Sequence, residues 1–150
     1  AQFVQILANL SGADLSSYGD KKASSFSDVA ENAWYAKAAA WAFDKGIAAG
    51  IKNEDGSINF SPDASISRQD MAVMILRYTE KVGGYSLTAT SSAAVFSDDS
   101  QIADYAKEAV TQLQQAGLLN GKTSSTFAPK NNATRAESAK MISMLIEKSL

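Results

Sequence analysis

The sequence predicts an all-α fold made of tandem helix–loop–helix repeats. Two observations indicate this fold: one ordered set of short motifs occurs twice, and each occurrence holds two stretches whose apolar residues recur at helical spacing. A third is that no stretch of convincing length alternates between apolar and polar residues, as a β-strand would. A two-helix repeat cannot bury its apolar face alone, so neighbouring copies are expected to pack together.

The first half of the repeat runs from a short aromatic motif to a pair of glycines. Phe26-Ser27-Asp28 recurs as Phe96-Ser97-Asp98, and in both copies a polar turn and an alanine-rich stretch follow. Next come an aromatic residue, a glycine twelve positions later and a second glycine four positions after that. These positions are Trp34, Gly46 and Gly50 in one copy and Tyr105, Gly117 and Gly121 in the other. The first glycine of each pair stands where a helix would end in a left-handed residue, a conformation that costs glycine little.

The second half of the repeat predicts the start of a helix. Phe60-Ser61-Pro62 corresponds to Phe127-Ala128-Pro129, and Ser67-Arg68-Gln69-Asp70 corresponds to Thr134-Arg135-Ala136-Glu137. A hydroxyl residue three positions before an acid fits the capping box, in which the hydroxyl accepts a hydrogen bond from a backbone N–H and the acid reaches back. The motif therefore places the arginine of each copy in the first turn of the second helix.

The motifs also predict where the helices and repeats begin and end. Helices are expected at residues 32–45, 67–82, 102–116 and 134–148. A partial copy precedes them, because apolar residues from Phe3 to Leu10 match those that open the later second helices. The expected module has four parts: the helix and tail of a truncated first repeat at 1–20, a second repeat at 26–83, a linker at 84–95 and a third repeat at 96–150.

Composition excludes several classes of function. The formal net charge of −2, with lysine and arginine scattered along the chain, offers no basic patch for nucleic acid. No apolar run approaches the roughly 18 to 20 residues that span a bilayer. The chain has no cysteine and no histidine, which excludes thiolate or imidazole metal sites and a histidine general base. We expect no catalytic residues, no metal and no cofactor.

The ordered series F-S-D, an aromatic residue, G-[IL]-x-x-G, F-x-P and [ST]-R-x-[DE] resembles the S-layer homology repeat of bacterial surface proteins. Residues 134–137 reproduce the family's T-R-A-E signature, and residues 67–70 are a conservative departure from it. The resemblance covers nearly all of the chain outside two linkers. It implies a module of three repeats packed as a pseudo-trimer, located outside the cell at the cell wall or S-layer.

The resemblance also implies a ligand, a pyruvylated secondary cell-wall polysaccharide held in grooves between repeats. The chain would then anchor a surface protein to the wall without covalent chemistry. Arg68 and Arg135 would meet the carboxylate of a pyruvate ketal, because a guanidinium can bind a carboxylate through two parallel hydrogen bonds. The other residues that the resemblance assigns to the grooves are Asp28, Asp98, Trp34, Tyr105, Gly50 and Gly121.

Structural explanations stay open for these residues. The two arginines could form salt bridges between repeats, and the two aromatic residues could pack in the core with a wet edge. For Asp28 and Asp98, a turn or N-cap role ahead of the first helix and a role in ligand binding stay equally open.

Two other functions stay open as well. One is a protein-interaction or self-assembly scaffold at the cell surface, and the other is a carbohydrate-active enzyme that uses two acids. The truncated first copy leaves one groove incomplete unless a further segment or another copy of the chain completes it.

Overall fold

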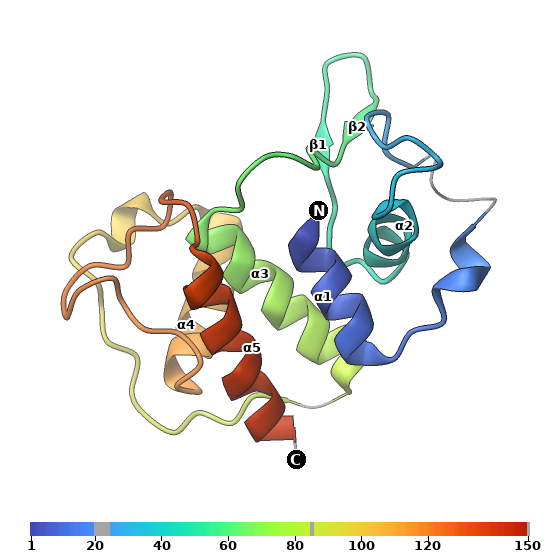
Figure 1. Cartoon of the computed structure of the whole chain (residues 1–150). Helices are drawn as coiled ribbons and strands as arrows, with labels where there is room; N and C mark the ends of the chain where they lie inside the picture. The colour runs from blue at the N-terminus through green and yellow to red at the C-terminus, as the bar shows by residue number, and fades with distance from the viewer. Residues whose placement is uncertain (20–24, 85, 150) are drawn as a thin grey trace. The chain divides into compact units, whose positions relative to one another are not determined.

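The computed structural model describes residues 1–19, 25–84 and 86–149 of the chain (Figure 1). The chain divides into two compact units, Ala1–Ala64 and Ser65–Leu150. The boundary between them falls between the two helices of the second repeat. The units and the repeats therefore divide the chain at different positions. Each unit begins with the second helix of one repeat and continues with the first helix of the next.

The first unit is built on two short helices, α1 (Gln2–Ser11) and α2 (Ala36–Asp44), which pack against each other. A short 3-10 turn, Leu15–Tyr18, lies between them in the sequence. The buried side chains of α2 are alanines apart from Trp41, which is 1% exposed. Because methyl groups fill little space, the neighbouring helix can approach α2 closely and enclose the one large ring.

A small hairpin in the first unit corrects the all-α prediction. Strand β1 (Ile51–Lys52) pairs antiparallel with β2 (Ile58–Asn59), with Ile51 opposite Asn59. The turn between them is closed by the Asn53 N–H, which donates to the Ser57 carbonyl over 2.8 Å. Strands of two residues are too short to show alternation, so the pattern in the sequence could not reveal them.

The second unit contains three α-helices in its described residues: α3 (Arg68–Tyr78), α4 (Asp104–Gln115) and α5 (Arg135–Ser149). One π-helical turn, Thr79–Gly83, continues α3, and a 3-10 turn, Asp99–Gln101, precedes α4. The described residues are thus about half helical, with one small sheet.

The predicted capping box is complete at the start of α5, whereas at the start of α3 only its hydroxyl cap is formed. The Ser67 hydroxyl accepts from the Asp70 N–H over 3.1 Å at the start of α3. At the start of α5 the exchange is reciprocal, because the Thr134 hydroxyl accepts from the Glu137 N–H over 3.1 Å and Glu137 Oε2 accepts from the Thr134 N–H over 2.8 Å. Each arginine is accordingly the first residue of its helix.

The left-handed glycines are confirmed as well. Gly46 (φ 66°) follows α2 and Gly117 (φ 73°) follows α4. The predicted helix 32–45 begins later than expected, at Ala36, because residues 31–35 form turns and Tyr35 provides no side-chain cap.

The core of the second unit lies mainly where α3 packs on α4, and α5 contributes to it. Its fully enclosed side chains include Met71, Ile75, Leu113, Phe127 and Leu145. Outside the core, the Thr90 and Ser91 N–H groups donate to the Gln115 carbonyl at the end of α4, over 2.8 and 3.2 Å. The segment predicted as a linker is therefore tied to the helix end. Within the described ranges, no helix is both long and apolar enough to cross a membrane.

Candidate functional site

The two aspartates of the F-S-D motif hold the backbone of the F-x-P motif. Asp28 accepts from the Phe60 and Ser61 N–H groups, each over 2.7 Å. Asp98 accepts from Phe127 over 2.8 Å and from Ala128 over 2.7 Å. Both carboxylate oxygens are used in each case. Both aspartates therefore fill a structural role, but it is a long-range one across 29 to 33 residues and not the local turn or N-cap role considered from the sequence.

These carboxylates brace an unfavourable backbone. Ser61 (φ 57°) and Ala128 (φ 55°) are left-handed although neither is glycine. Such a residue costs roughly 1–2 kcal/mol, and charge-assisted hydrogen bonds of the kind Asp98 accepts are strong enough to offset it. Burial acts to raise the pKa of Asp98, but the N–H groups of Phe127 and Ala128 and the charge of Arg68 outweigh it and hold that pKa below its ordinary value.

The second glycine of each copy packs against the phenylalanine of the F-S-D motif. A Cβ atom on Gly50 would lie 2.6 Å from Phe26 Cε1, and one on Gly121 would lie 2.9 Å from Phe96 Cε1. Either contact is closer than packed carbon atoms tolerate. Glycine at these positions thus has a packing reason that does not involve a ligand.

Arg68 is buried inside the second unit and is only 3% exposed. Its Nε donates to the Phe127 carbonyl over 2.8 Å and its Nη2 to the Asn120 carbonyl over 2.9 Å. Its Nη1 forms an ion pair with Glu137, and the guanidinium carbon lies 5.0 Å from the centre of the Phe127 ring. All three nitrogen atoms are engaged within the protein. These contacts favour the salt-bridge explanation for Arg68, since the arginine of the second repeat ties α3 to the loop and helix of the third.

Glu137 binds a second cation besides Arg68. Lys122 Nζ lies 3.1 Å from Glu137 Oε1, and its side chain is 45% exposed. Burial acts to raise the pKa of Glu137. The hydrogen bond from the Thr134 N–H and the charges of Lys122 and Arg68 outweigh burial, so the pKa of Glu137 lies below its ordinary value. Sequence reasoning did not identify Lys122, because nothing comparable occurs in the second repeat, where Ile51 holds the equivalent position.

Arg135 has a different environment from Arg68 although their motifs match. It is solvent-exposed at the first position of α5. A guanidinium at this position can reach a ligand in solution.

The two aromatic residues are at the surface. Trp34 is 64% exposed and Tyr105 is 60% exposed, so the core-packing explanation is wrong for both. The Trp34 ring stands edge to face with the Tyr35 ring, 5.3 Å between centres. The Tyr105 hydroxyl donates to Asp70 Oδ1 over 2.7 Å and accepts from Gln69 Nε2 over 3.1 Å. Each ring can offer its face to a ligand.

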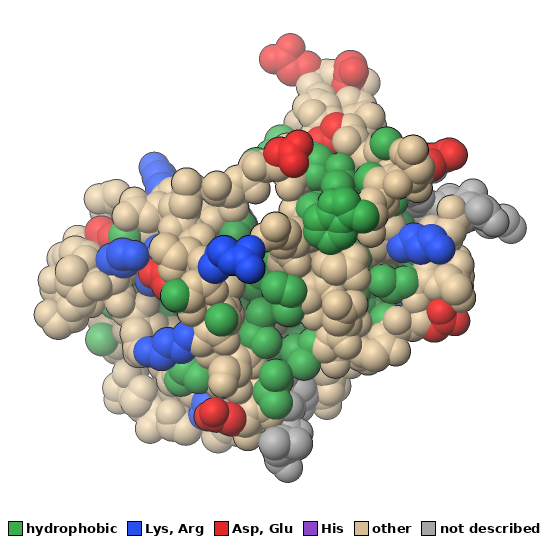
Figure 2. Space-filling view, viewed as in Figure 1, with side chains coloured by type: hydrophobic (Ala, Val, Ile, Leu, Met, Phe, Trp, Pro, Cys, Tyr) green, Lys and Arg blue, Asp and Glu red, His purple; other side chains and the backbone are tan. Residues whose placement is uncertain are grey.

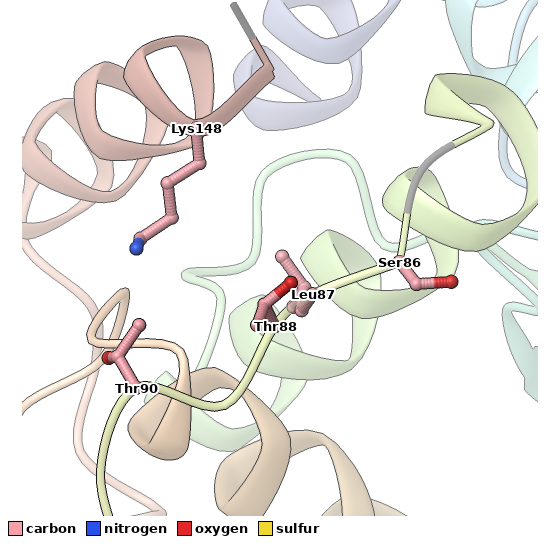
Figure 3. A pocket seen from close by; sticks show the side chains of 5 residues that line it. All are labelled: Ser86, Leu87, Thr88, Thr90 and Lys148. Atoms are coloured by element: carbon pink, nitrogen blue, oxygen red, sulfur yellow. The ribbon is translucent and has the colours of Figure 1, made fainter.

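Two other surface features involve none of these residues. Figure 2 shows acidic side chains at the outer end of the β1–β2 hairpin, where Glu54 and Asp55 are exposed. A pocket of about 220 Å³ lies in the second unit between the segment 86–90 and Lys148 of α5 (Figure 3). None of the predicted site residues lines this pocket. Among the residues that the structure describes, no three acidic side chains are grouped to hold a metal ion.

These contacts define the class of this chain: a helical repeat module in which an aspartate braces each F-x-P turn and an arginine opens each second helix. The family model of the S-layer homology domain matches residues 25–72 and 95–139, more than half of the chain. The chain therefore belongs to the S-layer homology domain family, and the prediction made from its motifs is confirmed.

Similar proteins are large and match over one region. An amylopullulanase of Thermoanaerobacterium thermosulfurigenes is 41% identical over 124 residues, which cover 83% of this chain and 6% of that protein. Cell surface glycoprotein 1 of Acetivibrio thermocellus is 32% identical over 99% of this chain and 6% of its own length. The cellulosome-anchoring protein of the same species is 28% identical over 99% of this chain and 32% of its own length. This chain thus spans a small part of each relative.

Proposed function

We propose that this chain is a non-catalytic anchoring module that binds an anionic, pyruvylated cell-wall polysaccharide outside the cell. Membership of the S-layer homology domain family supports a role in attachment. The names of two relatives, a cell surface glycoprotein and a cellulosome-anchoring protein, support the location. The amylopullulanase matches over only 6% of its length, and we place its activity in the parts outside the match.

One observation carries the proposal most directly. Trp34 and Tyr105 occupy the same position of two repeats, and both expose more than half of their surface. Leaving a large aromatic side chain in water is unfavourable compared with burying it. Two exposed rings at matched positions therefore indicate surfaces kept for binding. Sugars offer an apolar face to which such rings are complementary.

The residues divide into two groups under this proposal. Arg135, Trp34 and Tyr105 contact the polysaccharide, with Arg135 meeting the ketal carboxylate. The residues that shape the surrounding loops are Arg68, Asp28, Asp98, Gly50 and Gly121. We further propose that three repeats form the pseudo-trimer of the family and that the glycan lies in grooves between neighbouring repeats.

Binding of purified wall polysaccharide before and after chemical removal of pyruvate tests the function. The proposal requires that the intact glycan binds and that removal of pyruvate weakens binding at least about tenfold, the effect of one charge-assisted contact. Arg135→Ala is expected to produce a similar loss with intact glycan, whereas Lys140→Ala, on the exposed surface of the same helix, is the matched control. Equal binding to both glycans would overturn the role of pyruvate. No glycan binding, together with concentration-dependent association of the chain, would favour the scaffold instead.

A further inference from the structure

Gln69 connects the first turn of α3 to the start of α4. Gln69 is only 8% exposed, and the oxygen and the nitrogen of its side-chain amide both form hydrogen bonds. Nε2 donates to the Tyr105 hydroxyl over 3.1 Å, and Oε1 accepts from the Ala103 N–H over 3.1 Å. Ala103 is the N-cap of α4 and supplies no side-chain cap itself. One buried amide thus holds the start of the helix and the tip of the exposed ring.

The Tyr105 hydroxyl is fixed by two partners on α3. It donates its proton to Asp70 Oδ1 over 2.7 Å and accepts from Gln69. The ring is therefore held at the helix by its Cβ and at the opposite end by its hydroxyl, although 60% of the residue is exposed. Immobilising an aromatic side chain before binding removes part of the entropic cost of the association.

The pair differs one repeat earlier. Gln69 belongs to the second repeat and Tyr105 to the third, so the corresponding pair joins the first copy to the second and, with Phe3 aligned on Met71, consists of Ala1 and Trp34. An indole N–H only donates, so it could not accept a hydrogen bond from the amide of Gln69, whereas a phenol can accept and donate at once. The glutamine is suited to tyrosine and not to tryptophan.

We propose that Gln69 is a positioning residue that presents the Tyr105 ring, already oriented, to the apolar face of a sugar. The inference rests on the proposed glycan binding. It assigns Tyr105 a stacking role only, because its hydroxyl is occupied within the protein.

Variants of the whole chain test the inference by their affinity for purified wall polysaccharide. Tyr105→Phe keeps the ring and removes both hydrogen bonds of the hydroxyl, to Asp70 and from Gln69, and we expect affinity to fall about fivefold. The affinity of Gln69→Ala is expected to fall by a similar factor. Combining the two should weaken binding no further than Tyr105→Phe alone, because that variant already lacks the hydrogen bond from Gln69. Gln112→Ala, on α4 away from Tyr105, is the control and should bind as the wild type does.

Two further variants separate positioning from a general structural role. Tyr105→Trp in the wild-type background should bind weakly, whereas the double variant Gln69→Ala/Tyr105→Trp should bind within about twofold of wild type, since it reproduces the corresponding pair, Ala1 and Trp34. A loss caused only by unfolding would not be restored by a second substitution. If wild type binds the glycan but Tyr105→Phe and Gln69→Ala bind equally well, the positioning role is overturned and the anchoring function stands. If wild type itself does not bind, the anchoring function fails, and the role of Gln69 in it fails as well.

Discussion

Asp98 Oδ2 lies 2.7 Å from the backbone nitrogen of Ala128, a non-glycine residue with left-handed φ of 55°. The same pair recurs in the other repeat, where Asp28 and left-handed Ser61 are also 2.7 Å apart. The F-S-D and F-x-P motifs are thus two parts of one device, in which a carboxylate holds the backbone in a conformation that it would otherwise avoid.

Asp98→Ala should lower the free energy of unfolding by about 2–3 kcal/mol, because two N–H groups lose charged hydrogen-bond partners. Urea unfolding followed by far-UV circular dichroism measures the change. Asp99→Ala removes an exposed acid from the next position and should alter stability by less than about 0.5 kcal/mol. Equal stability of the two variants would contradict the bracing role.

Ala128→Gly should raise the free energy of unfolding by about 0.5 kcal/mol. Glycine removes the left-handed strain, worth roughly 1–2 kcal/mol, but loses part of this gain to the greater entropy of its unfolded chain. Ala136→Gly, in the first turn of α5, is the opposite control and should destabilise by about 0.5–1 kcal/mol. Thermal denaturation of both variants checks the difference in sign.

Acid should destabilise the second unit through Asp98 and Glu137. Their pKa values in the folded chain lie below the ordinary values of 3.8 and 4.5. A carboxyl with a lowered folded pKa contributes stability that is complete above its unfolded pKa and is lost as the pH falls through the folded one. Urea midpoints should therefore be level above about pH 5 and fall progressively below pH 4.5. Glu137→Gln should make that fall shallower, whereas a parallel curve for this variant would exclude Glu137 as a source.

The two arginines should respond differently to removal. Arg68→Ala leaves a partly buried Glu137 and two carbonyls without their donors, and loss of one partner of a buried ion pair costs about 3–5 kcal/mol. Arg135→Ala changes an exposed position and should cost less than about 0.5 kcal/mol.

Arg68→Lys separates charge from geometry, since it keeps the charge but cannot satisfy three acceptors, and should lie between wild type and Arg68→Ala. Calorimetric melting of Arg68→Ala, Arg68→Lys and Arg135→Ala measures these differences in stability. Equal melting temperatures for Arg68→Ala and wild type would show that its buried contacts add no stability.

Features that depend on neighbouring residues could be predicted from the sequence. The hydroxyl caps at Ser67 and Thr134 and the left-handed Gly46 and Gly117 were all predicted, because a cap and its helix are only a few residues apart. The β1–β2 hairpin was missed for the converse reason. Two-residue strands carry no periodic pattern, and the turn residues between them suit a loop equally well.

The sequence by itself determined the repeat, the starts of the second helices and the family, since each depends on which residues recur and in what order. Only the tertiary structure decided the roles of the repeated residues. Arg68 and Arg135 stand in matching motifs, yet one is enclosed by a loop 52 to 59 residues away and the other faces solvent. A side chain's burial and partners come from segments distant in the chain, so equal motifs acquire unequal environments when the chain packs.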